Sequence, residues 1–90
     1  MMIEHEIIEQ IDEEPVGRSL KWCIDFATGL GCPDSIATIS QMWRAGYLAM
    51  ADRHGQSLAD WKIERVMRTG GEHSDVFVLA TNLGSEWAHG

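Results

Sequence analysis

The sequence predicts an α+β fold in which three helices are followed by a β-hairpin. Apolar residues recur at spacings of three and four in three successive stretches before residue 51, as on the buried face of a helix. Farther along, residues 75–81 are rich in β-branched and aromatic side chains, which favours a strand. Gly70 and Gly71 precede this strand and suit the turn of a hairpin.

The first predicted helix is acidic and covers residues 1–14. Its apolar stripe consists of Ile3, Ile7, Ile8 and Ile11, and most other positions are carboxylates. Pro15 ends the segment, because the residue before a proline avoids the helical conformation. Isoleucine also favours strands, so a strand is the alternative for this segment.

The second predicted helix covers residues 16–30. Its stripe consists of Val16, Leu20, Cys23, Ile24 and Ala27, which share one face of an amphipathic helix. Trp22 and Phe26 lie beside this stripe and widen it. Gly29 and Gly31 supply the end of the helix.

The third predicted helix covers residues 35–51 and has the clearest start signal, because Asp34 is a good N-cap. Its stripe consists of Ile36, Ile39, Trp43, Tyr47 and Met50. Gly46 lies inside it and costs about 1 kcal/mol relative to alanine. An earlier end, near Tyr47, is therefore the alternative.

The first strand of the predicted hairpin starts at Trp61. Apolar and polar residues partly alternate from there, and a loop at residues 70–74 leads into the second strand. The alternative is a helix over residues 58–67, capped by Ser57. We favour the hairpin, because the helix would leave the strand at 75–81 without its nearest partner. Residues 82–87 then form one short helical turn.

Two stretches resemble small bacterial winged helix-turn-helix regulators. Residues 39–48 look like a recognition helix that ends in an "aGyL" or "aGlV" element, and residues 65–71 with 76–84 look like the wing. Two features depart from that family: Ala80 separates Leu79 from Thr81, and the distance from Leu48 to Trp61 is long. The resemblance covers residues 34–87. It implies a single winged-helix-like domain over residues 1–90, with the hairpin wing at 61–81.

The resemblance implies a helix in the major groove of DNA and a wing beside the backbone. Carried onto this chain, the DNA-contacting positions of the helix are Thr38, Gln41 and Arg44, with Ser40 beside them. Those of the wing are Lys62, Arg65 and Arg68, with Gly70 and Gly71 at its tip. Arginine and glutamine can read base edges, and wing arginines can hold phosphates. The implied function is that of a DNA-binding or transcription-associated regulator, and a homodimer would double its footprint.

The charge of the chain favours a second hypothesis. The net charge is −7, with carboxylates concentrated in the first third and most cations between residues 44 and 68. Few cations mean little counterion release and a weak intrinsic affinity for duplex DNA. The alternative is a protein–protein interaction module, an adaptor or an inhibitor from a phage or mobile element. It would bind a basic protein through Glu9, Glu13, Glu14 and Trp87 and would not bind DNA.

Other classes of function lack a motif. No serine lies in a nucleophile elbow, and Gly70 and Gly71 are not followed by the lysine of a phosphate-binding loop, so we expect no enzyme. Single, scattered histidines with only Cys23 and Cys32 predict no metal site and no cofactor. No apolar stretch approaches the roughly 20 residues of a membrane span, and no secretory signal is visible, which predicts a cytoplasmic protein. Four tryptophans are many for this length, and Trp43 and Trp61 fall on predicted core stripes.

Overall fold

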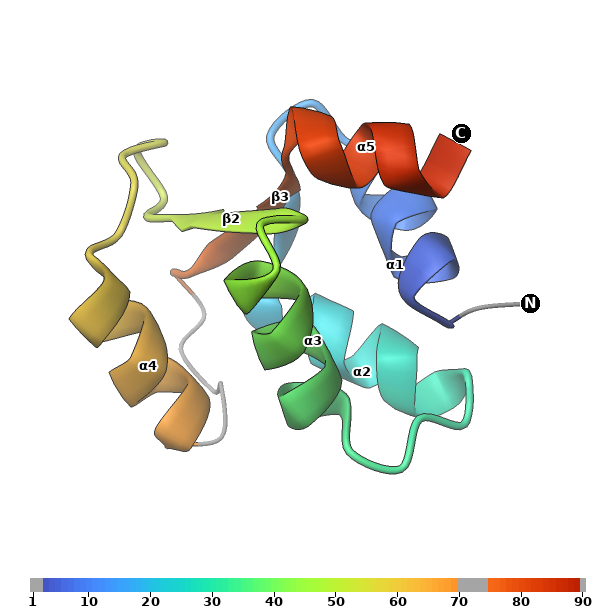
Figure 1. The fold of residues 1–90 in the computed structure, drawn as a ribbon. Helices are drawn as coiled ribbons and strands as arrows, with labels where there is room; N and C mark the ends of the chain where they lie inside the picture. Colours follow the sequence, from blue (N-terminus) through green and yellow to red (C-terminus); the bar gives the residue numbers. More distant parts are fainter. Residues whose placement is uncertain (1–2, 70–74, 90) are drawn as a thin grey trace.

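The computed structural model describes residues 3–69 and 75–89 of the chain. In chain order the elements are α1 (Ile3–Asp12), β1 (Arg18–Ser19), α2 (Leu20–Gly29), α3 (Ser35–Arg44), β2 (Leu48–Ala51), α4 (Asp60–Arg68), β3 (Phe77–Ala80) and α5 (Asn82–His89) (Figure 1). The predicted α+β class is confirmed. Within the described residues, however, there are five helices and a three-stranded antiparallel sheet, which differs from three helices followed by a hairpin.

The last strand in the chain, β3, lies in the middle of the sheet, whose order is β1-β3-β2. Met50 of β2 and Arg18 of β1 both pair with Val78 of β3. The hairpin predicted over residues 61–81 is therefore wrong, because β3 finds its partners much earlier in the chain. The predicted loop at residues 70–74 lies outside the described residues.

The segment predicted as the first hairpin strand is helix α4. Ile63 and Met67, four residues apart, are its buried residues, and this spacing matches one face of a helix. The alternative of a helix over residues 58–67 was thus close to the truth, although Ala59 and not Ser57 precedes its first residue. Trp61 falls on the opposite side of α4 and is 61% exposed, so its predicted place in the core is wrong.

The third helix ends at Arg44 and not at residue 51. Gly46 adopts φ +86°, a left-handed conformation that glycine reaches without strain and that ends a helix. The chain then enters β2, so Met50 reaches the core from a strand. The N-cap prediction is confirmed, because Asp34 Oδ1 accepts the Ala37 backbone N–H at 3.1 Å.

The first two helices are largely as expected. Helix α1 ends at Asp12, three residues before Pro15. Helix α2 begins only at Leu20, because Ser19 caps it by accepting the Trp22 backbone N–H at 3.1 Å. The turn and strand that precede α2 leave Val16 71% exposed, so its predicted place on the buried stripe is wrong.

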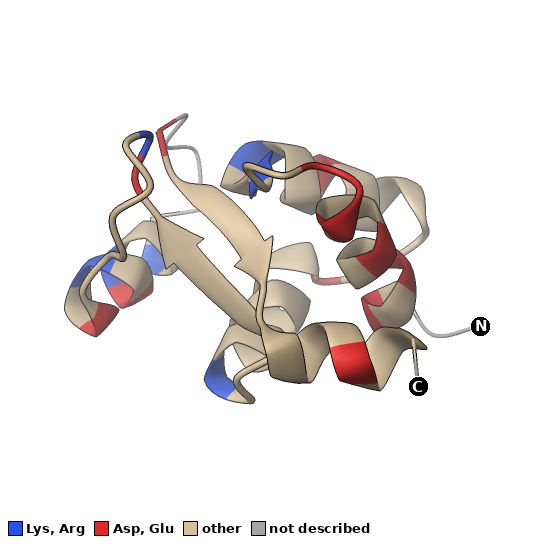
Figure 2. Cartoon of the chain, turned by 90° about the horizontal axis from the view of Figure 1, so that it is seen from above, with Lys and Arg blue, Asp and Glu red and all other residues tan. Residues whose placement is uncertain are grey.

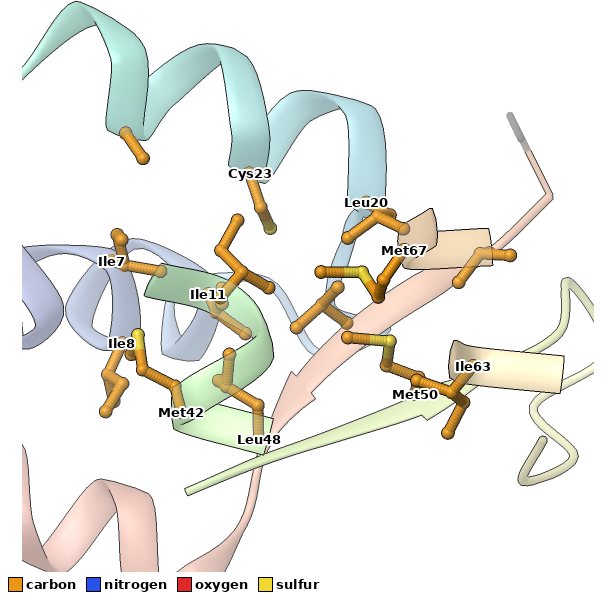
Figure 3. Packing of buried hydrophobic residues seen from close by; sticks show 14 of the residues in the cluster. Ile7, Ile8, Ile11, Leu20, Cys23, Met42, Leu48, Met50, Ile63 and Met67 are labelled. Atoms are coloured by element: carbon orange, nitrogen blue, oxygen red, sulfur yellow. The ribbon is translucent and has the colours of Figure 1, made fainter. Parts of the chain in front are cut away.

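The core lies between the helices and the inner face of the sheet. Ile7, Ile8 and Ile11 of α1 are fully buried, and they meet Leu20 and Cys23 of α2 (Figure 3). Further buried members are Met42 of α3, Leu48 and Met50 of β2, Val78 of β3, and Ile63 and Met67 of α4. Helices α1 to α4 and strands β2 and β3 thus contribute buried residues to one cluster.

Helix α5 is longer than the predicted single turn and packs along α1 (Figure 1). The Ser85 hydroxyl donates to Asp12 Oδ2 at 2.9 Å, and His89 Nε2 lies 3.1 Å from the same oxygen. At its first turn, the buried Gly84 lies directly against the backbone of Tyr47. These contacts join the end of the fold to its first helix and to the start of β2.

Candidate nucleic-acid interface

Helices α2 and α3 pack against each other and are joined by residues 30–34. The outward face of α3 carries Ala37, Gln41 and Arg44, which are exposed and spaced four and three residues apart. Thr38 is half-buried and not exposed, and its hydroxyl lies 3.1 Å from the Cys32 thiol in the connecting turn. The structure therefore places Gln41 and Arg44 on one outward stripe and Thr38 at its side.

Helix α4 flanks this stripe. A shallow hollow of about 330 Å³ separates α3 from α4, and it is lined by Ile36, Ser40, Arg44, Glu64, Met67 and Arg68. Arg44 Nη2 lies 4.0 Å from Glu64 Oε1, and both side chains are exposed, so this ion pair contributes little stability. The structure thus places the predicted residues Arg44 and Arg68 at the same hollow between α3 and α4.

The other two predicted wing cations, Lys62 and Arg65, do not border this hollow. They line a second hollow, of about 580 Å³, together with Trp61, Leu58, Val66 and Val76. Lys62 Nζ lies 5.5 Å from the centre of the Trp61 ring, within the range of a cation–π contact. Asp52 and Asp75 also line this hollow, so its charge is mixed. Gly70 and Gly71, the predicted wing tip, lie outside the described residues.

Trp87, proposed from the sequence as a partner-binding residue, is half-buried. Its ring stacks on Tyr47 with 4.4 Å between ring centres, and the His5 ring packs against it in a T-shaped arrangement with 4.2 Å between ring centres. These contacts join α5, α1 and the residue before β2. Trp87 and Glu4 border a small hollow beside Gln41, so a carboxylate lies at one side of the outward stripe of α3.

Charge is segregated across the molecule. Figure 2 shows the acidic residues gathered along α1 and the loop that follows it, whereas α4 and the end of α3 carry most of the basic ones. Glu9, Glu13 and Glu14 are exposed, and Glu14 Oε1 lies 3.7 Å from Arg18 Nη1. An anionic ligand that approaches from the α3–α4 side therefore avoids most of the carboxylates.

The Cys23 thiol is buried in the core. Burial raises the pKa of the Cys23 thiol to about 12, an effect that nearby Arg18 partly opposes. A thiol with this pKa is protonated at neutral pH and is a poor nucleophile. Among the residues described, no three His, Cys, Asp or Glu side chains come together as metal ligands, and no helix has the length and apolar character to cross a membrane.

The sequence analysis predicted that Gln41 and Arg44 are exposed on a helix. It did not predict which elements lie beside that helix. The helical spacing of Ile63 and Met67 was the signal that could have placed Arg68 on a helix and Trp61 in solvent. The packing of α4 beside α3 had no local signal. No protein-family model, curated protein or solved structure matches this chain.

Proposed function

We propose that this chain is a small DNA-binding protein with a winged-helix-like fold, in which α3 enters the major groove. The observation that carries the proposal is the outward stripe of α3 with Gln41 and Arg44, flanked by Arg68 of α4. The order of elements supports it, because a helix-turn-helix pair is followed by two strands that pair with each other. Helix α4 lies in the connection between β2 and β3, where the resembled family has its wing.

The side chains on this surface suit contacts to both bases and backbone. A glutamine amide can make two hydrogen bonds to adenine, and an arginine can do the same to guanine. Arg68, with Lys62 and Arg65 on the preceding turns of α4, would contact phosphates and hold the protein in register. The exposed Arg44–Glu64 pair is loose enough that Arg44 can leave it for DNA at little cost.

The small number of cations determines how binding depends on salt. With three to four phosphate contacts per copy, affinity should fall roughly 40- to 150-fold between about 50 and 200 mM salt. Anisotropy of a labelled random-sequence duplex at these two concentrations measures this fall directly. Absence of binding at the lower concentration, by protein shown to be folded by circular dichroism, would rule the proposal out.

Arg44→Ala combined with Arg68→Ala should weaken duplex binding at least about tenfold and make its salt dependence shallower. Both side chains are exposed, so the thermal unfolding temperature should not change. Lys21→Ala is the matched control, because it removes an exposed cation that borders neither hollow of α4. Wild-type affinity in the double variant would contradict the assignment of this surface.

The charge segregation favours a second candidate function, which is docking of a basic protein on α1. Glu9 on α1 and Glu13 just after it are exposed, and Figure 2 shows acidic residues along α1 and the loop that follows it. If this candidate is correct, Glu9→Lys combined with Glu13→Lys should abolish the complex with such a protein, because the contact would then join like charges. The same variant should bind duplex DNA at least as well as the wild type. A complex that survives the reversal would exclude this surface.

A further inference from the structure

The face of the sheet that points away from the core is apolar. Ala49 pairs with Leu79 and Ala51 with Phe77, and paired residues of antiparallel strands project to the same side. Ala51 is buried and the other three are half-buried, so the chain itself covers part of this face. The alternate residues of the same strands, including Met50 and Val78, are buried in the core. Strands that are apolar on both sides are typical of sheets covered on both faces. Figure 2 nevertheless shows β2 and β3 toward the viewer with no described helix across them.

This outer face forms a groove with different charges at its two ends. Its middle is a hollow of about 490 Å³ that includes Val16, Phe77 and Leu79, with Arg53 and His54 at one end. An adjoining hollow of about 180 Å³ is also lined by Leu79, Asp12 and Glu14. Asp12 already contacts Ser85 and His89, and Glu14 lies 3.7 Å from Arg18, but both carboxylates remain exposed. The groove is thus apolar in the centre, basic at the tip of the turn after β2, and acidic at the end of α1.

Asp52 belongs to the basic end but is occupied within its own turn. Its Oδ1 accepts the backbone N–H groups of His54 at 2.8 Å and of Gln56 at 3.0 Å. These bonds fix the turn, and they also lower the pKa of Asp52. Arg53 and His54 remain exposed, and the described part of the structure gives them no ion pair.

We propose that a second copy of this chain covers the groove, in a two-fold dimer that sets Arg53 and His54 of one copy over Asp12 and Glu14 of the other. In a two-fold interface the same patch is used on both copies, so each contact occurs twice. A groove with opposite charges at its ends and an apolar centre is complementary to itself under this rotation. The inference rests on the sheet and stands independently of DNA binding.

The apolar area of the groove is small, so the dimer should be weak. A stable interface buries about 800 Å² per partner, whereas this face offers only a few side chains around Val16, Phe77 and Leu79. We therefore expect a reversible dimer that forms in the micromolar range of protein concentration. Sedimentation equilibrium from about 5 to about 500 μM covers this range and should show exchange between monomer and dimer.

Val16→Asp should raise the dissociation constant of the dimer at least about tenfold, because it places a carboxylate in the apolar centre. The wild-type side chain is 71% exposed, so the monomer should remain folded, with an unchanged unfolding temperature. Trp61→Asp is the matched control, since it alters an exposed apolar residue on α4, outside the groove, and should leave dimerisation unchanged.

A charge exchange tests the orientation of the two copies. Arg53→Glu alone and Glu14→Arg alone should each weaken the dimer, whereas the two together should restore it, because the opposite charges then meet again across the interface. A wild-type chain that is monomeric at about 500 μM would overturn the proposal. So would a dimer indifferent to Val16→Asp, or a charge-exchanged double variant weaker than both single variants. None of these outcomes depends on whether the chain binds DNA.

Discussion

Ile8→Ala should lower the free energy of unfolding by about 2–5 kcal/mol, the range for removing a large, fully buried aliphatic side chain. Ile8 has no exposed surface and belongs to the central cluster to which α1, α2, α3 and the sheet all contribute (Figure 3). Its loss leaves a cavity that the surrounding elements close only in part. Since a small domain is stable by about 5–15 kcal/mol in total, this single change removes a large share.

Urea denaturation followed by tryptophan fluorescence measures this loss. Ile8→Val should cost only about 0.5–1.5 kcal/mol, because it deletes one methylene group and not most of the side chain. Leu83→Ala is the control on α5, where the side chain is half exposed and truncation should cost about 0.5 kcal/mol or less. Equal losses for the Ile8→Ala and Leu83→Ala variants would contradict the packing of α1 into the core.

Gly84→Ala should destabilise the fold by about 2–3 kcal/mol, although alanine is the better helix former. A Cβ atom at this position would overlap the carbonyl oxygen of Tyr47 and lie 2.9 Å from its carbonyl carbon. That carbonyl cannot easily move, because it accepts the Thr81 backbone N–H at 3.1 Å and precedes β2 directly. Relief therefore requires α5 to shift away from the sheet.

Thermal unfolding followed by circular dichroism tests this expectation. For a domain of this size, the loss corresponds to a fall of roughly 10–20 °C in Tm. Gly29→Ala is the matched control within α2, because a Cβ there meets nothing within 4 Å. It should be neutral or stabilise by up to about 1 kcal/mol. A Gly84→Ala variant with the same Tm as the wild type would show that α5 does not pack tightly against Tyr47.

The sequence predicted the parts of the fold that depend on neighbours three or four residues away. The isoleucine stripe of α1 and the Asp34 cap of α3 are such local features, and both are confirmed. Val16 was misplaced because its stripe continued the helical spacing across a turn and a short strand. Spacing alone does not show where a helix starts, and the Ser19 cap is what decides it.

The sheet could not be predicted, because its strands are paired across long stretches of chain. The assumption that β3 must pair with its nearest neighbour led to the prediction of a strand where α4 lies. The helical spacing of Tyr47 and Met50 led to the prediction that the third helix includes β2. The same limit applies to the candidate interface. Gln41 and Arg44 were implied by the resemblance to winged-helix regulators, whereas the position of Arg68 beside Arg44 follows from tertiary packing, which the local sequence does not indicate.

The central place of β3 in the sheet also dictates when the fold can form during synthesis. Both β1 and β2 pair only with β3 among the named strands, and β3 ends at Ala80, near the end of the described residues. Because the chain is synthesised from its N-terminus, helices α1 to α4 leave the ribosome before β3 does. No two of these strands can pair before β3 has emerged. Until then the apolar residues of β2 have no strand to pair with, so the sheet and the core that packs on it can form only after residues 77–80 have been synthesised.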